Sequence, residues 1–224
     1  MAIQGRVAPD VPLDCFASLA MTTSFRVLLG GGMVKSVVLA WGSLVWDPRE
    51  LQIAGKFMAD GPLLPIEFCR ISDDGRLTLA IDESFGTLCK TYSAPSALDS
   101  LDAARDNLCL REGMEDARAI GFVEPASGIQ SDFALENHPQ VVATIAAWAE
   151  SIGYDAAIWT ALASNFDEWG KGGEPFSVSA ALQYLETLEG EDPAKFAQAL
   201  AYIRKAPHEV ETPVREEVAR RWRV

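Results

Sequence analysis

The carboxylate of Glu112 has the setting expected of a general acid or base. It closes a helical pattern over 96–112, which has a serine near its start and Gly113 directly after its end. Glu112 follows Leu108 by four residues and Leu101 by eleven, so the three side chains share one helical face. An apolar surrounding and the negative end of the helix dipole both raise the pKa of a carboxylate. A carboxylate with a pKa nearer neutrality suits proton transfer.

An ion pair at the helix end is an equally good explanation of this glutamate. Arg105 and Arg111 both lie within reach of Glu112 on the same helical pattern. Glu83 is a weaker rival for the base, because an exposed loop at the end of a strand does not raise the pKa of a carboxylate. The choice of Glu112 therefore depends on its burial.

A small-residue turn, Gly42-Ser43, is the second candidate feature. It follows an apolar run over 37–40 and precedes Leu44-Val45-Trp46. The pattern predicts a buried strand that delivers a loop at its C-terminal end, where backbone N–H groups face a ligand. Two plainer alternatives stay open: Ser43 as a small turn residue, and Trp41 as a core aromatic.

Other polar residues on strands and turns are left out of the predicted site. Arg70, Arg76 and Lys90 fall on strand patterns, where arginines and lysines more often lie on a solvated face. Asn165 and Phe166 follow the last strand pattern, and a role in a turn is at least as good an explanation for them as a place in a pocket.

The strand and helix patterns along the chain predict a single α+β domain with a helical C-terminal third. Strand patterns at 63–72, 76–82 and 86–92, with a hairpin signal at Asp73-Asp74-Gly75, predict an antiparallel meander. We expect residues 132–133 to form a loop or an edge strand. The other predicted strands cover 37–40 and 155–161, and the other predicted helices cover 138–152, 177–188, 193–205 and 213–222.

Composition excludes several classes of partner. The 224 residues carry a formal net charge of −13, which argues against nucleic acid and against an anionic membrane surface. Four cysteines and two histidines show no zinc-site spacing, so no metal is expected. Cys69 and Cys89 lie in apolar strand patterns and are expected to be buried free thiols. We therefore expect a reducing, cytoplasmic location.

Residues 1–33 are expected to be a poorly ordered N-terminal extension, with one domain over 34–224. The segment 17–34 is neither long nor apolar enough for a membrane span, and no signal-peptide pattern is evident. One hypothesis is that the natural start is Met33. The glycine run 30–32 precedes a strand instead of following one, which argues against a phosphate-binding loop.

Three segments occur along the chain in an informative order. The first reads W-G-S-L-V-W over 41–46 and continues into Asp47-Pro48. The second runs from Leu101 and Leu108 to Arg111-Glu112-Gly113, and the third reads I-W-T-A-L over 158–162, followed by Asn-Phe.

Together these segments resemble the γ-glutamylcyclotransferase-like family, in its ChaC-like branch, over about residues 34–215. The resemblance implies a small, mixed and mostly antiparallel barrel or sheet with flanking helices. It implies cyclisation of the γ-glutamyl group of glutathione, or of another γ-glutamyl amine or peptide, to 5-oxoproline with release of the amine. No metal or cofactor is implied, and the implied partner is a small γ-glutamyl substrate.

The same resemblance assigns roles to individual residues. Glu112 matches the family's catalytic glutamate, and Trp41, Gly42, Ser43 and Leu44 match its substrate-binding loop. The family loop usually opens with tyrosine, so Trp41 lacks the phenolic hydroxyl, and an indole N–H can donate but not accept. A non-catalytic binding module of the same fold is therefore the alternative function.

Overall fold

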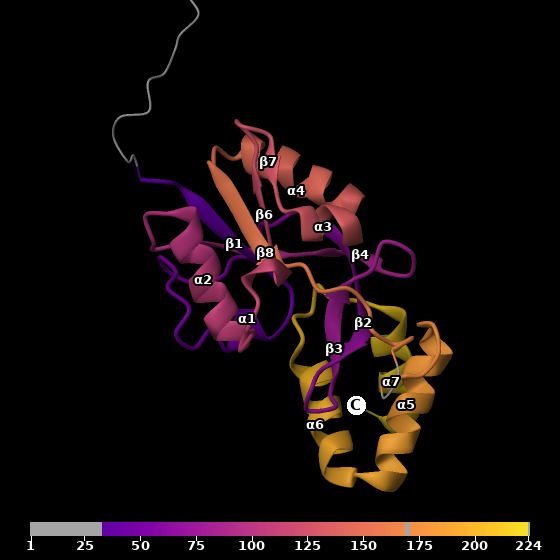
Figure 1. Ribbon diagram of the computed structural model, residues 1–224. Coiled ribbons are helices and arrows are strands. Elements are labelled where there is room, and N and C mark those ends of the chain that lie inside the picture. The colour runs from indigo at the N-terminus through magenta and orange to yellow at the C-terminus, as the bar shows by residue number, and fades with distance from the viewer. Residues whose placement is uncertain (1–32, 169–170, 224) are drawn as a thin grey trace, which may run out of the picture. The chain divides into compact units, whose positions relative to one another are not determined.

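The computed structural model describes residues 33–168 and 171–223, and these form one compact unit (Figure 1). Residues 1–32 of the expected poorly ordered extension, with the glycine run 30–32 and Cys15, lie outside the described residues. Within the described part, every helix is too short or too polar to cross a bilayer. The mixture of sheets and helices confirms the predicted α+β class.

A five-stranded sheet forms the centre of the unit, in the order β5-β1-β8-β6-β7. β1 and β8 run parallel, and the other three pairs are antiparallel. All five residues of β1 are buried, because helices cover both faces of the sheet. The strands are β1 (Ser36–Ala40), β5 (Tyr92–Pro95), β6 (Ile120–Glu124), β7 (Ile129–Gln130) and β8 (Ala156–Thr160).

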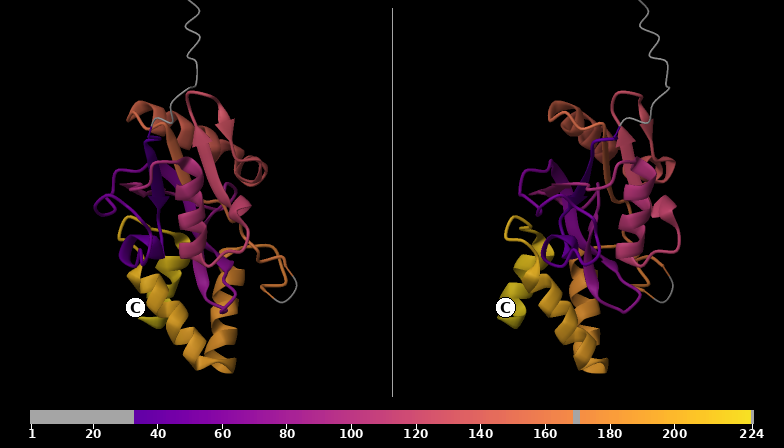
Figure 2. Two further views of the ribbon diagram at one scale, coloured as in Figure 1. Left: turned by 60° about the vertical axis from the view of Figure 1, so that its left-hand side comes forward. Right: turned by 90° about the vertical axis from the view of Figure 1, so that its left-hand side faces the viewer.

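Successive side chains of β1 point to opposite faces of the sheet, so the strand contributes to the core on both. Val38 points to the side of α2 (Leu101–Glu112), where Leu108 packs against it. Val37 and Leu39 point to the opposite side, where α3 (Asp132–Asn137) and α4 (Pro139–Ser151) lie. Figure 2 shows α2 on one side of the sheet and α4 on the other.

A second sheet has three strands in the order β3-β2-β4 and carries the C-terminal helices. Helix α6 packs on β3 and α7 packs on β2, at the lower end of the view in Figure 1. The strands are β2 (Leu63–Ile71), β3 (Leu77–Ile81) and β4 (Thr87–Lys90), and the helices are α5 (Val178–Glu191), α6 (Pro193–Lys205) and α7 (Pro213–Trp222).

Several expectations about strand order were wrong. Both sheets of the described part are open, so they do not close into a barrel. β2, not β3, is the central strand, so the predicted meander is incorrect. The single strand expected over 86–92 breaks at Thr91, whose buried hydroxyl donates to the Pro62 carbonyl at 2.6 Å. The break sends β4 and β5 into different sheets.

Helix boundaries also differ from the sequence-based expectation. The helix expected from 96 begins at Leu101, because the Ser100 hydroxyl accepts a hydrogen bond from Ala103 N–H and caps it. The predicted loop or edge strand at 132–133 is the start of α3, which Ser131 caps in the same way. The strands β6 and β7 and a short 3₁₀ turn (Ala117–Ala119) were not predicted. The expected loop after β1 contains one helical turn, α1 (Ser43–Trp46).

Candidate functional site

Two buried side chains, one before and one after it, hold the turn at Gly42-Ser43 in place. Trp41 is 4% exposed and packs in the larger core, on the α4 side of the sheet. Leu44 is also 4% exposed and packs in the core on the α2 side. The chain therefore leaves β1, turns at Gly42 and presents Ser43 at the first position of α1. Trp41 lies in the core, which is the plainer of its two sequence interpretations.

Glu112 is the last residue of α2, as the sequence predicts. Gly113 follows in the left-handed conformation, with φ of 69°, and its N–H closes the helix on the carbonyls of Cys109 and Leu110. The Glu112 side chain is only 20% exposed. The local stop signal therefore positions the carboxylate at the edge of the core.

Arg111 joins the end of α2 to the turn after β1. Its Nη1 donates to Glu112 Oε1 at 2.8 Å, and its Nη2 donates to the Asp47 carbonyl at 2.5 Å and to Ser43 Oγ at 3.3 Å. The Arg111 side chain is 3% exposed, so these contacts are shielded from solvent. The ion pair considered from the sequence is thus present, and its partner is Arg111 and not Arg105.

Two opposing effects act on the Glu112 carboxyl. Burial is the larger, and it raises the pKa of Glu112 above the ordinary value of 4.5. The positive charges of Arg111 and Arg49, and the hydrogen bond from Arg111, lower that pKa without cancelling the effect of burial. The upward shift of the Glu112 pKa that the apolar helix face predicts is therefore present. The site holds a carboxylate that is easier to protonate than an ordinary one.

Glu112 borders three cavities. One, of about 730 Å³, extends toward Asp74 and Met114. The other two share Ser43 and Tyr202. The smaller, of about 60 Å³, is bordered by all the sequence-predicted site residues: Trp41, Gly42, Ser43, Leu44 and Glu112. It has room for only a few water molecules. The larger, of about 340 Å³, is in the range of ligand pockets, and of the predicted residues only Ser43 and Glu112 reach it.

Tyr202 of α6 lies between the two cavities at Ser43, and no sequence pattern predicts its role. It lines both cavities, and its hydroxyl oxygen lies 2.7 Å from where a Cβ on Gly42 would stand. Its ring packs edge-on against Trp46 at 5.4 Å between centroids. Burial is the main cause that raises the pKa of Tyr202 to about 12, so the hydroxyl stays protonated near neutral pH. Tyr202 lies on the core-facing side of α6, so its position in the sequence looks like that of an ordinary core residue.

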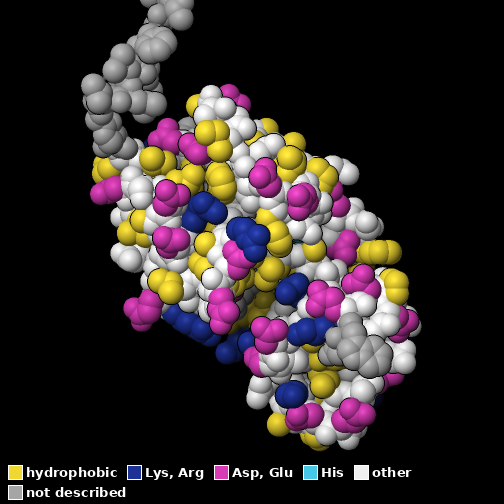
Figure 3. Space-filling view, viewed as in Figure 1, with side chains coloured by type: hydrophobic (Ala, Val, Ile, Leu, Met, Phe, Trp, Pro, Cys, Tyr) yellow, Lys and Arg dark blue, Asp and Glu magenta, His cyan; other side chains and the backbone are white. Residues whose placement is uncertain are grey.

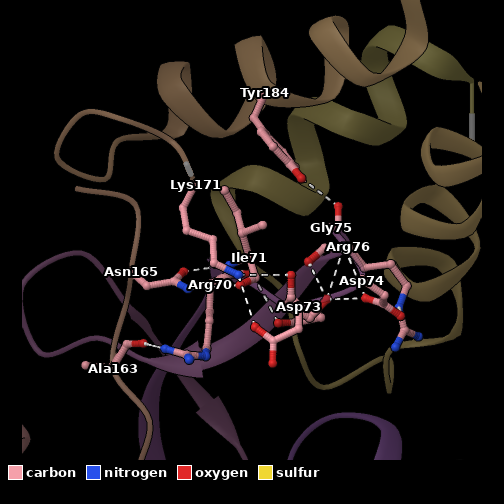
Figure 4. Close-up of polar contacts among 12 residues, drawn as sticks. Arg70, Ile71, Asp73, Asp74, Gly75, Arg76, Ala163, Asn165, Lys171 and Tyr184 are labelled. Atoms are coloured by element: carbon pink, nitrogen blue, oxygen red, sulfur yellow. Dashed lines mark hydrogen bonds and ion pairs between the residues drawn. The ribbon is translucent and has the colours of Figure 1, made fainter. Parts of the chain in front are cut away.

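The remaining candidates have structural partners. Glu83, the rival base, accepts hydrogen bonds from the N–H groups of Gln140 and Val141 at 2.8 and 2.9 Å, and so binds the first turn of α4. Asn165 accepts from Ile71 N–H at 2.8 Å and donates to the Ile71 carbonyl at 2.9 Å, as Figure 4 shows. These contacts attach the loop after β8 to Ile71, the last residue of β2.

The cysteines of the described part are buried in the core. Cys69, Cys89 and Cys109 are buried free thiols, and burial raises the pKa of each. Within the described ranges, His, Cys, Asp and Glu side chains do not gather in groups of three or more able to hold a metal ion. The chemistry available at the site is therefore that of Glu112 and its polar neighbours.

Comparisons of the chain with family models, with curated proteins and with solved structures found no match. The geometry described above is consequently the principal guide to function. The order of the three sequence segments is the second guide, through the resemblance that they carry.

Proposed function

We propose that this chain is a γ-glutamylcyclotransferase-type enzyme with a γ-glutamylcyclotransferase-like fold. Its substrate is glutathione or another γ-glutamyl amine or peptide, and its products are 5-oxoproline and the free amine. One observation carries the proposal: Glu112, mostly buried and with a raised pKa, faces the 340 Å³ cavity beside Ser43. That is the placement a proton-transfer group needs next to a bound small molecule.

In the proposed reaction the substrate supplies its own nucleophile. The α-amine attacks the γ-carbonyl carbon, a C–N bond forms, and the C–N bond to the leaving amine breaks. Glu112 takes one proton from the α-ammonium group, which frees the amine to attack, and gives it to the leaving nitrogen. The attacking nitrogen loses its second proton as the lactam forms, and that proton ends on the released amine as its ammonium form, so protons balance. Holding the substrate folded brings the amine to the carbonyl and supplies much of the rate.

Ser43 and the turn backbone are the proposed partners of the γ-glutamyl group. The Ser43 hydroxyl is held by Arg111 at 3.3 Å and is shared by both cavities. Donors aimed at the carbonyl oxygen would stabilise the negative charge that develops there. The hydroxyl of Tyr202 closes the small cavity over Gly42, so the substrate occupies the larger cavity. Trp41, Gly42 and Leu44 then act by shaping the turn.

The wider proposals follow from composition and burial. No cofactor and no metal take part, and neither nucleic acid nor membrane is a partner. Three buried free thiols fit a reducing, cytoplasmic location.

A non-catalytic binding module of the same fold is the second candidate. The observation that favours it is the size of the cavity at the turn, about 60 Å³, which is too small for a glutamyl group. Trp41 adds to this, because its buried indole supplies no hydroxyl to the site.

Release of 5-oxoproline from glutathione and a panel of γ-glutamyl compounds tests the proposal. Activity in the wild type that is lost in Glu112→Gln supports the enzyme, and Glu83→Gln is the matched control that removes the rival carboxylate. Full activity in Glu112→Gln would refute the base assignment. Binding of γ-glutamyl compounds without any turnover in the wild type would favour the binding module.

A further inference from the structure

Basic side chains gather around the 340 Å³ cavity of a strongly acidic chain. Arg49, Arg76, Arg111 and Lys205 border the cavity together with the acids Asp47 and Glu112, and Asp74 pairs with Arg76 behind the wall. The whole chain has a formal net charge of −13. Figure 3 shows Lys and Arg side chains on both sides of the hollow between the part of the molecule with α2 and the part with α6. Such a local excess of positive charge favours an anionic ligand.

The two acids of the wall are already neutralised. Glu112 is paired with Arg111 at 2.8 Å, and Asp47 is paired with Arg49 at 3.2 Å. Lys205, the last residue of α6, has no carboxylate within ion-pair distance among the described residues. The cavity wall therefore keeps an uncompensated positive charge at Lys205.

Arg76 is held so that it faces the same cavity. Asp74 pairs with its Nε at 2.8 Å, as the close-up in Figure 4 shows. Its guanidinium carbon lies 5.8 Å from the centre of the Tyr202 ring. Contacts at Nε and over the ring restrict the side chain, and a restricted guanidinium loses less entropy on binding a carboxylate.

Arg49 also borders the cavity, and its position there is set by a turn. It has φ of 50°, a left-handed conformation that a non-glycine residue adopts only when its surroundings impose it. The turn after α1, closed by the hydrogen bond from Leu51 N–H to the Pro48 carbonyl at 3.1 Å, holds it there. This backbone places Arg49 at the cavity wall, where its charge is paired with Asp47.

We propose that Lys205 and Arg76 form a carboxylate-binding subsite that selects the substrates of this site. The identity of the ligand rests on the proposed function, in which the reacting amide lies at Glu112. A γ-glutamyl amino acid offers two carboxylates: the α-carboxylate of the glutamyl group and that of the leaving amino acid. The subsite binds one of them, and compounds that lack one carboxylate or the other tell the two apart.

Three probes distinguish the two carboxylates: γ-glutamylglycine, γ-glutamylglycinamide and 4-aminobutyrylglycine. The amide lacks the leaving-group carboxylate, and the 4-aminobutyryl compound lacks the α-carboxylate. We expect Lys205→Gln and Arg76→Gln each to weaken binding of γ-glutamylglycine by about tenfold, the loss typical of a charge-assisted hydrogen bond. Neither variant should weaken binding of the probe that lacks the carboxylate held at the subsite.

Calorimetric binding, measured in a Glu112→Gln background, keeps this test independent of turnover. Arg204→Gln is the matched control, because Arg204 is an exposed neighbour on α6 that does not border the cavity. Lys205→Arg keeps the charge and should keep most of the affinity. Equal losses for all three probes, or equal losses in Arg204→Gln, would overturn the subsite.

Failure of the proposed function gives a different result. If the wild type releases no 5-oxoproline but binds γ-glutamylglycine in a manner that depends on Lys205, the subsite stands and the enzyme proposal falls. If the wild type is active and Lys205→Gln has the same KM as the wild type for γ-glutamylglycine, the enzyme stands and the subsite falls.

Discussion

Arg111 and Glu112, neighbours in sequence, meet side chain to side chain, with Nη1 of the arginine donating to Oε1 of the glutamate at 2.8 Å. The same guanidinium reaches the Asp47 carbonyl at 2.5 Å. Arg111 therefore has two separable functions: it lowers the pKa of Glu112 and it attaches α1 to α2. Variants of Arg111 need a measurement for each.

Loss of the Arg111 charge should move the acid side of the pH–rate profile upward. Arg111 lowers the pKa of Glu112, so Arg111→Gln lets burial raise that pKa further. Glu112 must be ionised to accept a proton, so activity at the acid side will be lost at higher pH than in the wild type. The profile of kcat/KM against pH measures this shift.

Arg105→Gln is the matched control for that profile, because it removes the same charge from the same helix. Arg105 stacks over Phe122 at 4.4 Å and has no part in setting the pKa of Glu112. An unmoved acid limb in Arg111→Gln would show that Glu112 does not control the profile.

Glu112 should also make the protein less stable as pH rises. Because burial raises the pKa of Glu112, the folded state binds its proton more readily than the unfolded chain. The stabilisation is fully present below the unfolded pKa and is lost as pH rises through the folded pKa. We expect the free energy of unfolding of Glu112→Gln, relative to the wild type, to increase between about pH 4 and about pH 8. Urea unfolding at the two pH values measures this, and a constant difference would contradict it.

Local signals predicted part of the site, and tertiary contacts determined the rest. Glu112 was predictable because Gly113 ends the helix and the apolar stripe faces the core, and both signals lie within a few turns of chain. Tyr202 and Lys205 border the same cavity from α6, some 90 positions after Glu112 in the chain. The hydrophobic periodicity of the sequence does not predict that α6 packs there. The sequence identified Glu112, its possible partner Arg111 and the turn at Ser43, but not the residues that α6 brings to them.

Strand order shows the same limit. The alternating patterns correctly located β2 and β3, but alternation does not say which neighbour a strand pairs with. After β3 the chain crosses the start of β2, where Asp82 N–H donates to the Pro65 carbonyl at 3.0 Å, and β4 joins the opposite edge. A Cβ on Gly86 would lie 2.5 Å from the backbone of Pro65, so glycine is needed at this crossing. The need for glycine there is visible only in three dimensions.

A larger residue at Gly121 should destabilise the central sheet. Gly121 of β6 is paired with Trp159 of β8, and a Cβ on it would lie 2.6 Å from the fully buried indole. Gly121→Ala should lower the free energy of unfolding by about 1–3 kcal/mol, as is typical of an overpacked core. Gly190→Ala is the control: Gly190 lies in α5 with open space around it, and alanine there should stabilise by about 0.5–1 kcal/mol. Chemical denaturation of both variants checks the pair, and equal effects would contradict the contact with Trp159.

Gly42 and Tyr202 should show strong coupling in a double-mutant cycle. A Cβ on Gly42 would lie 2.7 Å from the Tyr202 hydroxyl oxygen, whereas its next neighbours lie at 3.9 Å. The ring is restrained by Trp46 and Phe68, so it cannot move away freely. Gly42→Ala alone should destabilise the protein, and in a Tyr202→Phe background it should be tolerated, because the obstructing oxygen is gone.

The expected coupling free energy is about 1–2 kcal/mol, from urea unfolding of the four proteins of the cycle. Additive effects would show that the hydroxyl does not cover Gly42 in solution. Adding the rate of 5-oxoproline release to the cycle tests which cavity the substrate occupies. Tyr202→Phe removes one oxygen above the turn, so a gain in activity would mean that the small cavity accepts part of the substrate. Unchanged activity would place the whole substrate in the larger cavity, beside Ser43 and Glu112.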